Sequence, residues 1–212
     1  SGWVLDPLGE KMSKSKGNVI APQSFMEKYS ADALRFAAST SKLGEDSSFQ
    51  EKNVVTGQRT CTKLFNAAKF VFLQLKGVPP EKPTFTVLDE WLIAKRNKTI
   101  ATCTERFSEY DYAGARAEVD TFFWHTFCDH YLEMVKDRVY DGKDADGARK
   151  VLYDTLYIIV QLYAPILPHI TEEIYHTHYA KDHKMQSIHN TSWPVPITLP
   201  AAMSTKTLDA NT

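Results

Sequence analysis

The chain has 212 residues, of which 43% are hydrophobic and 24% are charged, and its formal net charge is −1. This balance is ordinary for a water-soluble globular protein and excludes a uniformly basic RNA-coating one, so any contact with nucleic acid must use a local basic patch. The cysteines form no CxxC pair, and no apolar run reaches about 18 residues. We therefore expect a reduced, cytoplasmic protein with no metal site and no membrane contact.

The first fifty residues predict short elements around a basic loop. Residues 1–8 are typical of a strand and turn or a short hairpin. Pro22 stands at a favourable first position for a short helix over 23–28, and Ser30 is a capping residue for a helix over 31–39. Residues 42–48 are polar, contain glycine, and predict a linker between two units.

The basic loop has a pattern that suits a polyphosphate. It reads Glu10-Lys11-Met12-Ser13-Lys14-Ser15-Lys16-Gly17-Asn18. In an extended backbone Lys14 and Lys16 would share one side, with the two serines opposite. Ammonium groups act as point charges against phosphate oxygens, and hydroxyl groups add hydrogen bonds. A solvated lysine-rich turn is the alternative for a generic loop of this composition.

Helical periodicity dominates after residue 50. Helices are predicted over 54–76, from a capping box at 86–89 through Phe107, over 111–140, over 144–164 and over 170–179. The third has an expected inner side of Val119, Phe122, Phe123, Phe127 and Met134. Residues 187–189 predict a short extended piece, and the tail from residue 199 is expected to fray. Long helices with short links predict a mainly α fold, an antiparallel bundle preceded by a small loop-bearing segment.

The string Lys11-Met12-Ser13-Lys14-Ser15 resembles the KMSKS signature of class I aminoacyl-tRNA synthetases. Its flanks are similar to that family as well, except that Ser30 stands where the family usually has glycine. The resemblance implies that Lys11, Met12, Ser13, Lys14 and Ser15 bind ATP at the edge of a Rossmann-like catalytic domain. It also implies that Lys11 and Lys14 are catalytic residues, because they stabilise the charge of the triphosphate. A stem-contact region over 22–49 and an anticodon-binding bundle of the class Ia type would follow.

Later stretches are similar to the valyl-tRNA synthetases. These are the runs 122–136 and 165–175, Ser187-Ile188-His189 and Trp193-Pro194. The resemblance implies a C-terminal part of a valine–tRNA ligase in three divisions. Residues 1–48 would be the KMSKS loop and stem-contact region, residues 49–198 the helical anticodon-binding domain, and residues 199–212 a disordered tail. The parent enzyme would use ATP with Mg²⁺, valine and valine tRNA, and would work in the cytoplasm.

The family's His-x-Gly-His signature does not occur in these 212 residues. We therefore expect that this chain alone binds no cofactor and does not activate valine. Two alternatives stay open. An isoleucyl-tRNA synthetase shares the layout and the loop, and a stand-alone RNA-binding or protein-interaction bundle could carry a relic loop.

Candidate RNA contacts come from exposed cations on the predicted helices. They are Lys95, Arg96 and Lys98 on the second helix and Lys136 and Arg138 near the end of the third, with Arg149 and Lys150 as weaker candidates. Such groups would contact phosphates and position the anticodon stem-loop. The alternative for each is a solvated helical face with ion pairs three or four residues apart.

Overall fold

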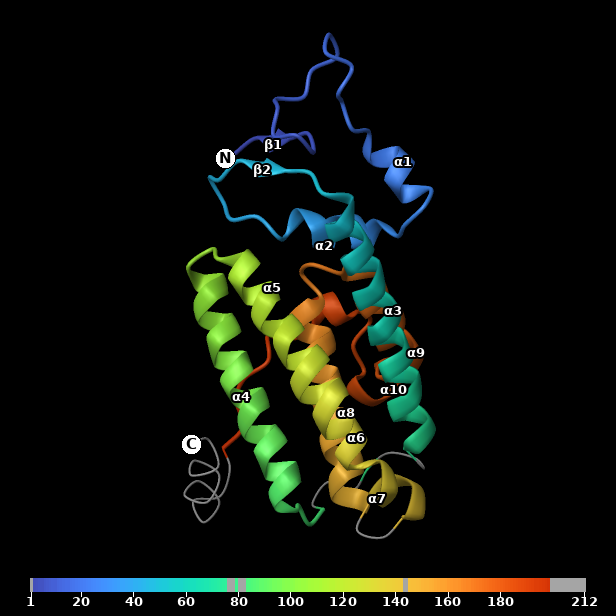
Figure 1. Ribbon diagram of the computed structural model, residues 1–212. Coiled ribbons are helices and arrows are strands. Elements are labelled where there is room, and N and C mark those ends of the chain that lie inside the picture. The colour runs from blue at the N-terminus through green and yellow to red at the C-terminus, as the bar shows by residue number, and fades with distance from the viewer. Residues whose placement is uncertain (1, 76–78, 80–82, 143–144, 199–212) are drawn as a thin grey trace.

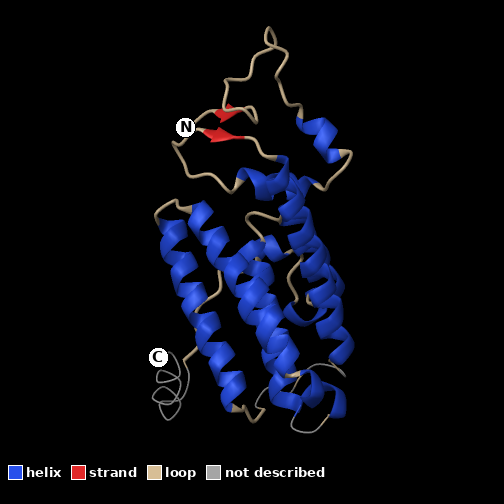
Figure 2. Cartoon of the chain, in the orientation of Figure 1, coloured by secondary structure: helices blue, strands red, loops and turns tan. Residues whose placement is uncertain are grey.

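A computed structural model describes residues 2–75, 79, 83–142 and 145–198. The described chain is mainly helical, with a small layer at the N-terminal side lying on one end of a long bundle (Figure 1, Figure 2). Successive long helices run in alternate directions, so the predicted antiparallel bundle is confirmed. No helix within the described ranges is long and apolar enough to cross a membrane. The expected frayed tail, 199–212, lies outside the described residues.

The small layer holds two strands and two short helices. Strand β1 (Val4–Leu5) pairs in parallel with β2 (Ser47–Ser48), and α1 (Pro22–Met26) and α2 (Ala31–Ala38) follow the loop. An antiparallel bridge between Leu5 and Lys11 closes the predicted turn after β1, but the strand that pairs with β1 lies about forty residues further along, inside the stretch predicted as a linker. Pro22 opens α1 and the Ser30 hydroxyl accepts the Ala33 N–H at 3.2 Å, as predicted.

The bundle follows in chain order. Its elements are α3 (Glu51–Gln74), α4 (Val87–Ser108), α5 (Tyr112–Thr121), a π-helix η1 (Phe122–Tyr131), α6 (Leu132–Met134), α7 (Lys136–Asp141), α8 (Ala145–Tyr163), α9 (Pro168–His178), α10 (Ala180–His183) and a 3₁₀ turn η2 (Ile188–Asn190). Helix α8 is the central one, and it contacts α3, α4, α5, α7 and α9. Its buried side chains include Leu152, Leu156, Ile159 and Leu162. The free cysteines, Cys61, Cys103 and Cys128, are buried among these helices.

The third predicted helix is interrupted by the π-helix, and its expected inner side is partly wrong. Val119 and Phe127 are buried, but Met134 is 54% exposed, and Val135 and Val139 are buried in its place. A π-helix has a wider turn of about 4.4 residues, whereas an α-helix has 3.6. Ten residues of it rotate the chain that follows by about half a turn relative to a continuous α-helix. An extrapolated α-periodicity therefore selects the wrong face after Tyr131.

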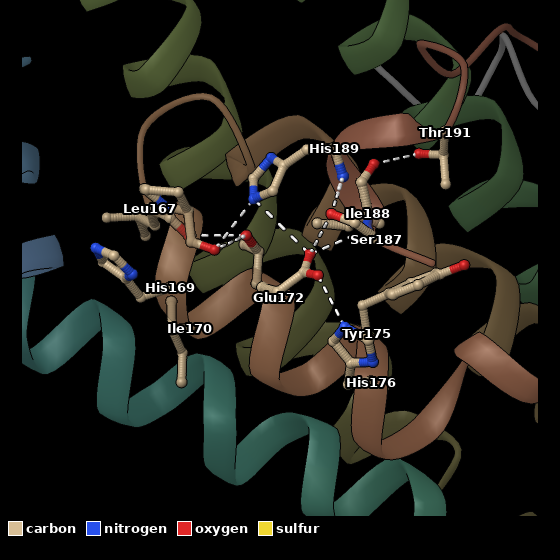
Figure 3. Close-up of polar contacts among 12 residues, drawn as sticks. Leu167, His169, Ile170, Glu172, Tyr175, His176, Ser187, Ile188, His189 and Thr191 are labelled. Atoms are coloured by element: carbon tan, nitrogen blue, oxygen red, sulfur yellow. Dashed lines mark hydrogen bonds and ion pairs between the residues drawn. The ribbon is translucent and has the colours of Figure 1, made fainter. Parts of the chain in front are cut away.

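The segment after α10 folds back onto α9 through Glu172 (Figure 3). One carboxylate oxygen of Glu172 accepts the Ser187 hydroxyl at 2.9 Å and the Ile188 N–H at 3.0 Å, and the other lies 2.9 Å from Nε2 of His176. Residues 188–190 form a 3₁₀ turn rather than the predicted extended piece. Trp193 then packs edge-on against Phe107, so this segment reaches α4.

Candidate functional site

The basic loop is a turn, not an extended strand. The Gly17 N–H donates to the Lys14 carbonyl at 3.2 Å, and Gly17 has a φ of 68°, a left-handed conformation that glycine adopts without strain. The hydroxyl oxygens of Ser13 and Ser15 lie 3.2 Å apart. The predicted arrangement, with alternate residues on opposite sides of an extended chain, is therefore wrong. The turn instead brings the two serine hydroxyl groups together, and its backbone forms a protruding tip of the chain (Figure 1).

The base of the loop is closed by Asp6 and Asn18. Asp6 is 6% exposed, and it accepts the Glu10 N–H at 2.8 Å and the side-chain amide N–H of Asn18 at 2.9 Å. The carbonyl oxygen of the same Asn18 amide accepts the Ser13 N–H at 2.9 Å. The backbone hydrogen bond with Glu10 and the side-chain hydrogen bond with Asn18 lower the pKa of the Asp6 carboxyl. These contacts fix both ends of the loop, and the sequence analysis missed them.

The three loop lysines differ in their surroundings. Lys11 Nζ lies 4.2 Å from the centre of the Trp3 ring, a cation–π contact, and Lys16 pairs with Glu10 at 3.0 Å. Lys14 is exposed and forms no ion pair or side-chain hydrogen bond with any residue that the structure describes. Lys14 is therefore the loop cation that can neutralise an incoming anion without losing a partner.

A cavity of about 510 Å³ lies beside the loop within the small layer, and residues of α2 form part of its wall. Met12, Ile20, Phe25 and Phe49 are among the side chains that line it, and most of the lining is apolar. Within the described chain, no three His, Cys, Asp or Glu side chains are placed to hold a metal ion. The cavity beside the loop therefore suits an apolar group. The groups that suit phosphate are the hydroxyl and ammonium groups of the turn.

The loop-bearing layer is fixed to the bundle through α2. The buried Asp32 carboxylate, 2% exposed, accepts the His169 N–H at 3.3 Å and the Ile170 N–H at 2.7 Å in the first turn of α9. Arg35 donates to the carbonyls of Pro165 and Ile166, each at 3.0 Å. The first N–H groups of a helix and the carbonyls of the turn before it have no partner within the helix. Here the Asp32 carboxylate accepts from the N–H groups, and the Arg35 guanidinium donates to the carbonyls. Asp32 and Arg35, named below the α2 clamp, thus hold the turn between α8 and α9.

The predicted RNA contacts on the bundle are only partly available. The expected exposure of Arg96 is wrong, because this side chain is 3% exposed and donates to the Thr155 hydroxyl at 3.4 Å. Arg138 makes a bidentate contact with the fully buried Asp89 at 2.9 and 3.0 Å. A helical projection places these two arginines on the outer face of their helices. In the structure they instead contact residues that are distant in the sequence, Thr155 and Asp89.

The remaining candidates lie nearer the surface. Lys136 is paired with Glu133 at 2.6 Å, which is the local alternative raised for such cations. Lys98 is exposed and Lys95 is half-buried. The structure does not bring these residues together with the loop, which lies at the opposite end of the molecule from α7 (Figure 1).

Two family models match the chain. Residues 89–210 match the anticodon-binding domain of tRNA ligase, and residues 1–50 match the class I tRNA synthetases (I, L, M and V). The valine–tRNA ligase of Haloarcula marismortui is 40% identical over 195 residues, which cover 92% of this chain and 21% of that protein. The valine–tRNA ligase of Wolbachia pipientis wMel is 41% identical over 198 residues, which cover 92% of this chain. That of Picrophilus torridus is 42% identical over 179 residues, which cover 83% of this chain.

The matched part of the chain thus covers 21–23% of the length of these relatives. A similar fold occurs in a solved LeuRS–tRNA–LeuAMS ternary complex from Agrobacterium radiobacter K84, with a TM-score of 0.70 and 19% identity. The match covers 92% of this chain and 23% of that one. At this identity the likeness establishes the mainly α bundle with its small N-terminal layer, as predicted.

Proposed function

Because this chain belongs to the anticodon-binding domain family of tRNA ligases, we propose that it is the part of a valine–tRNA ligase that joins the KMSKS loop to the anticodon-binding bundle. The observation that carries the proposal is the 40% identity to a valine–tRNA ligase over 92% of the chain. In this proposal residues 1–48 contact the catalytic domain and the tRNA stem, and residues 49–198 dock the anticodon stem-loop of valine tRNA. The parent ligase works in the cytoplasm.

The loop residues Lys11 to Ser15 fit the triphosphate of ATP. The unpaired Lys14 ammonium and the adjacent Ser13 and Ser15 hydroxyls support this fit, since cations and hydroxyl donors are the groups that stabilise phosphate oxygens. Lys14 offsets charge that develops as pyrophosphate leaves, and Lys11 assists after leaving the Trp3 ring. In the parent enzyme, ATP with Mg²⁺ would transfer its adenylyl group to the valine carboxylate, and pyrophosphate would leave.

The bundle holds the RNA through phosphate contacts that position the anticodon. The candidates for such contacts are Lys95 and Lys98 on α4 and Lys136 on α7. Arg96 and Arg138 are not among them, because they contact Thr155 and Asp89 inside the bundle. The His-x-Gly-His signature does not occur in these 212 residues, so we expect the chain alone to bind tRNA without activating the amino acid.

Two measurements test the proposed function. The purified chain should bind a valine tRNA transcript more tightly than an isoleucine tRNA transcript, with affinity falling as salt rises. It should also give no valine-dependent exchange between ATP and pyrophosphate. Equal binding of both transcripts would remove the valine assignment, absence of binding at low salt would refute docking by the bundle, and measurable exchange would refute the inactive state. Lys14→Ala is the matched control, because it removes a loop charge and should leave tRNA affinity nearly unchanged.

A further inference from the structure

Helix α10 is held to the bundle by stacked aromatic rings. The imidazole of His183 lies almost flat on the Tyr157 ring of α8, with centroids 4.1 Å apart and an interplanar angle of 17°. It is also nearly parallel to the Tyr153 ring at 6.4 Å and lies edge-on to Tyr179 at 5.9 Å. A helix of only four residues is not stable by itself, so the position of α10 depends on these contacts.

Two hydrogen bonds attach both ends of the same short stretch. The Tyr153 hydroxyl donates to the Asp182 carboxylate at 2.8 Å, and the Tyr175 hydroxyl donates to the Met185 carbonyl at 3.0 Å. Between them Lys184 has a φ of 55°, a left-handed conformation that is strained for a residue with a side chain. The chain therefore turns sharply after α10, and contacts on both sides of the turn hold it there.

One ring nitrogen of His183 lacks a partner. Its Nε2 atom is buried and forms no hydrogen bond with any described residue. A neutral imidazole can carry its proton on the other nitrogen, which leaves only a lone pair at Nε2. A protonated imidazole has an N–H on both nitrogens, so a charged donor would be buried without an acceptor. The packed position of α10 therefore suits the neutral ring better than the cation.

The charged groups that face His183 come from α8 and from α10 itself. On α8, Lys150 and Asp154 form an ion pair at 2.7 Å, and Asp182 precedes His183 on α10. The two carboxylates favour a protonated imidazole, whereas burial and the Lys150 ammonium disfavour it. Burial is the largest of these effects, so the pKa of His183 is lowered from its ordinary value of 6.5.

Helix α9 and its end add titratable groups that are neutral at neutral pH. Burial raises the pKa of the Tyr175 and Tyr179 phenols, so both stay uncharged there. His178 stacks on Phe72 of α3, with centroids 3.9 Å apart and an interplanar angle of 5°, and burial lowers its pKa as well. His178 thus belongs to the contact between α9 and α3, whereas the His183 ring belongs to α10.

We propose that α10 is a pH-sensitive latch, which the neutral His183 ring keeps packed on Tyr157 and which protonation of His183 releases. The released state binds the proton more readily, so the packed state is fully stable above about pH 6.5 and loses stability as the pH falls below that value. Release would free the turn that leads to residues 187–197, which reach α4 through Trp193. The latch involves no RNA and goes beyond the proposed function.

Hydrogen exchange of the full chain tests the latch. The amides of His183 and Lys184 donate to the Tyr179 and Ala180 carbonyls at 3.0 Å each, so they report on α10. Their protection factors, corrected for the intrinsic effect of pH on exchange, are compared with those of amides in the middle of α8. We expect α10 protection in wild type to fall about three- to eightfold from pH 7 to pH 5.5, since one linked proton allows at most tenfold per pH unit.

Two variants separate the proposed sensor from its neighbour. His183→Phe keeps a ring that can stack on Tyr157 but cannot be protonated, so its α10 protection should not change with pH over this range. His178→Phe is the matched control, because it removes the other stacked imidazole and should keep the wild-type pH dependence. An NMR titration of the His183 ring in wild type depends on neither variant, and its midpoint should lie below 6.5.

Every other outcome overturns the proposal. Wild-type α10 protection that does not change with pH, or a His183 midpoint at or above 6.5, would show that the packed state tolerates the cation. A pH dependence that persists in His183→Phe, or that disappears in His178→Phe, would place the sensor elsewhere. If α8 loses protection as much as α10 does, the whole bundle opens in acid and α10 is no separate latch.

Discussion

Replacing Asp32 by alanine removes the buried half of the α2 clamp. The carboxylate is 2% exposed and accepts backbone N–H groups of His169 and Ile170, so it caps α9 from another helix. Loss of a capping side chain costs about 0.5–2 kcal/mol, and a hydrogen bond to a charged group contributes about 1.5–3 kcal/mol. We therefore expect the free energy of unfolding to fall by about 2–3 kcal/mol, which corresponds to roughly 4–12 °C in Tm for a chain of this size.

Urea unfolding followed by circular dichroism measures this loss. Asp46→Ala is the control, since Asp46 also accepts one backbone N–H, from Trp3 at 2.7 Å, but does so at the surface. That variant should lose less than about 0.5 kcal/mol. Hydrogen exchange should show faster exchange in the first turn of α9 for Asp32→Ala alone. A loss below about 0.5 kcal/mol in Asp32→Ala, or unchanged exchange in α9, would refute the role assigned to this carboxylate.

Three further predictions concern the core. Gly57→Ala should destabilise the chain by about 1–2 kcal/mol in urea unfolding, because the added Cβ would lie 2.7 Å from the Ala33 carbonyl oxygen and overpacking outweighs the gain in helix propensity; a more stable variant would contradict this. Asp89→Asn should cost about 3–5 kcal/mol at neutral pH, because it removes the buried negative charge that pairs with the half-buried Arg138 guanidinium. Burial raises the pKa of the Asp89 carboxyl, but the hydrogen bonds from Arg138, Tyr131 and Thr86 outweigh it, so the pKa is lowered. The ionised carboxylate therefore stabilises the folded chain at pH values above the ordinary pKa of 3.8, and this stabilisation is lost as the pH falls below that value. The difference between wild type and Asp89→Asn should therefore shrink in acid, and a difference independent of pH would exclude the ion pair as its source. Burial raises the pKa of the three cysteine thiols to about 11 or 12, so a thiol reagent at pH 8 should modify them only as fast as the chain unfolds.

Local signals in the sequence were reliable guides to the helix ends. Pro22 and Ser30 begin their helices as expected, and the Thr86 N–H donates to Asp89 at 2.8 Å, as a capping box requires. These interactions span only a few residues, so composition and spacing are sufficient to predict them. The mainly α bundle followed from helical periodicity for the same reason.

Features that depend on distant partners were not predictable in this way. Arg96 is buried against Thr155, which is 59 residues away, and nothing near Arg96 in the sequence indicates that neighbour. The π-helix depends on how its aromatic side chains pack, so an α-period assigned Met134 to the wrong side. In the loop, the KMSKS string was recognised, but its conformation depends on the Asp6–Asn18 hydrogen bond across 12 residues.

The α2 clamp also sets an order of assembly during synthesis. Helix α2 is made before the long helices of the bundle, and the groups that Asp32 and Arg35 hold lie 130 to 138 residues later in the chain. A ribosome releases the chain from its N-terminal side, so the turn between α8 and α9 emerges long after α2. Until then α2 can pack against α1 and α3, and against Arg116 once α5 has been made. The contacts that close the base of the KMSKS loop can therefore form early, whereas the contacts that join α2 to the turn between α8 and α9 form only when the bundle is almost complete.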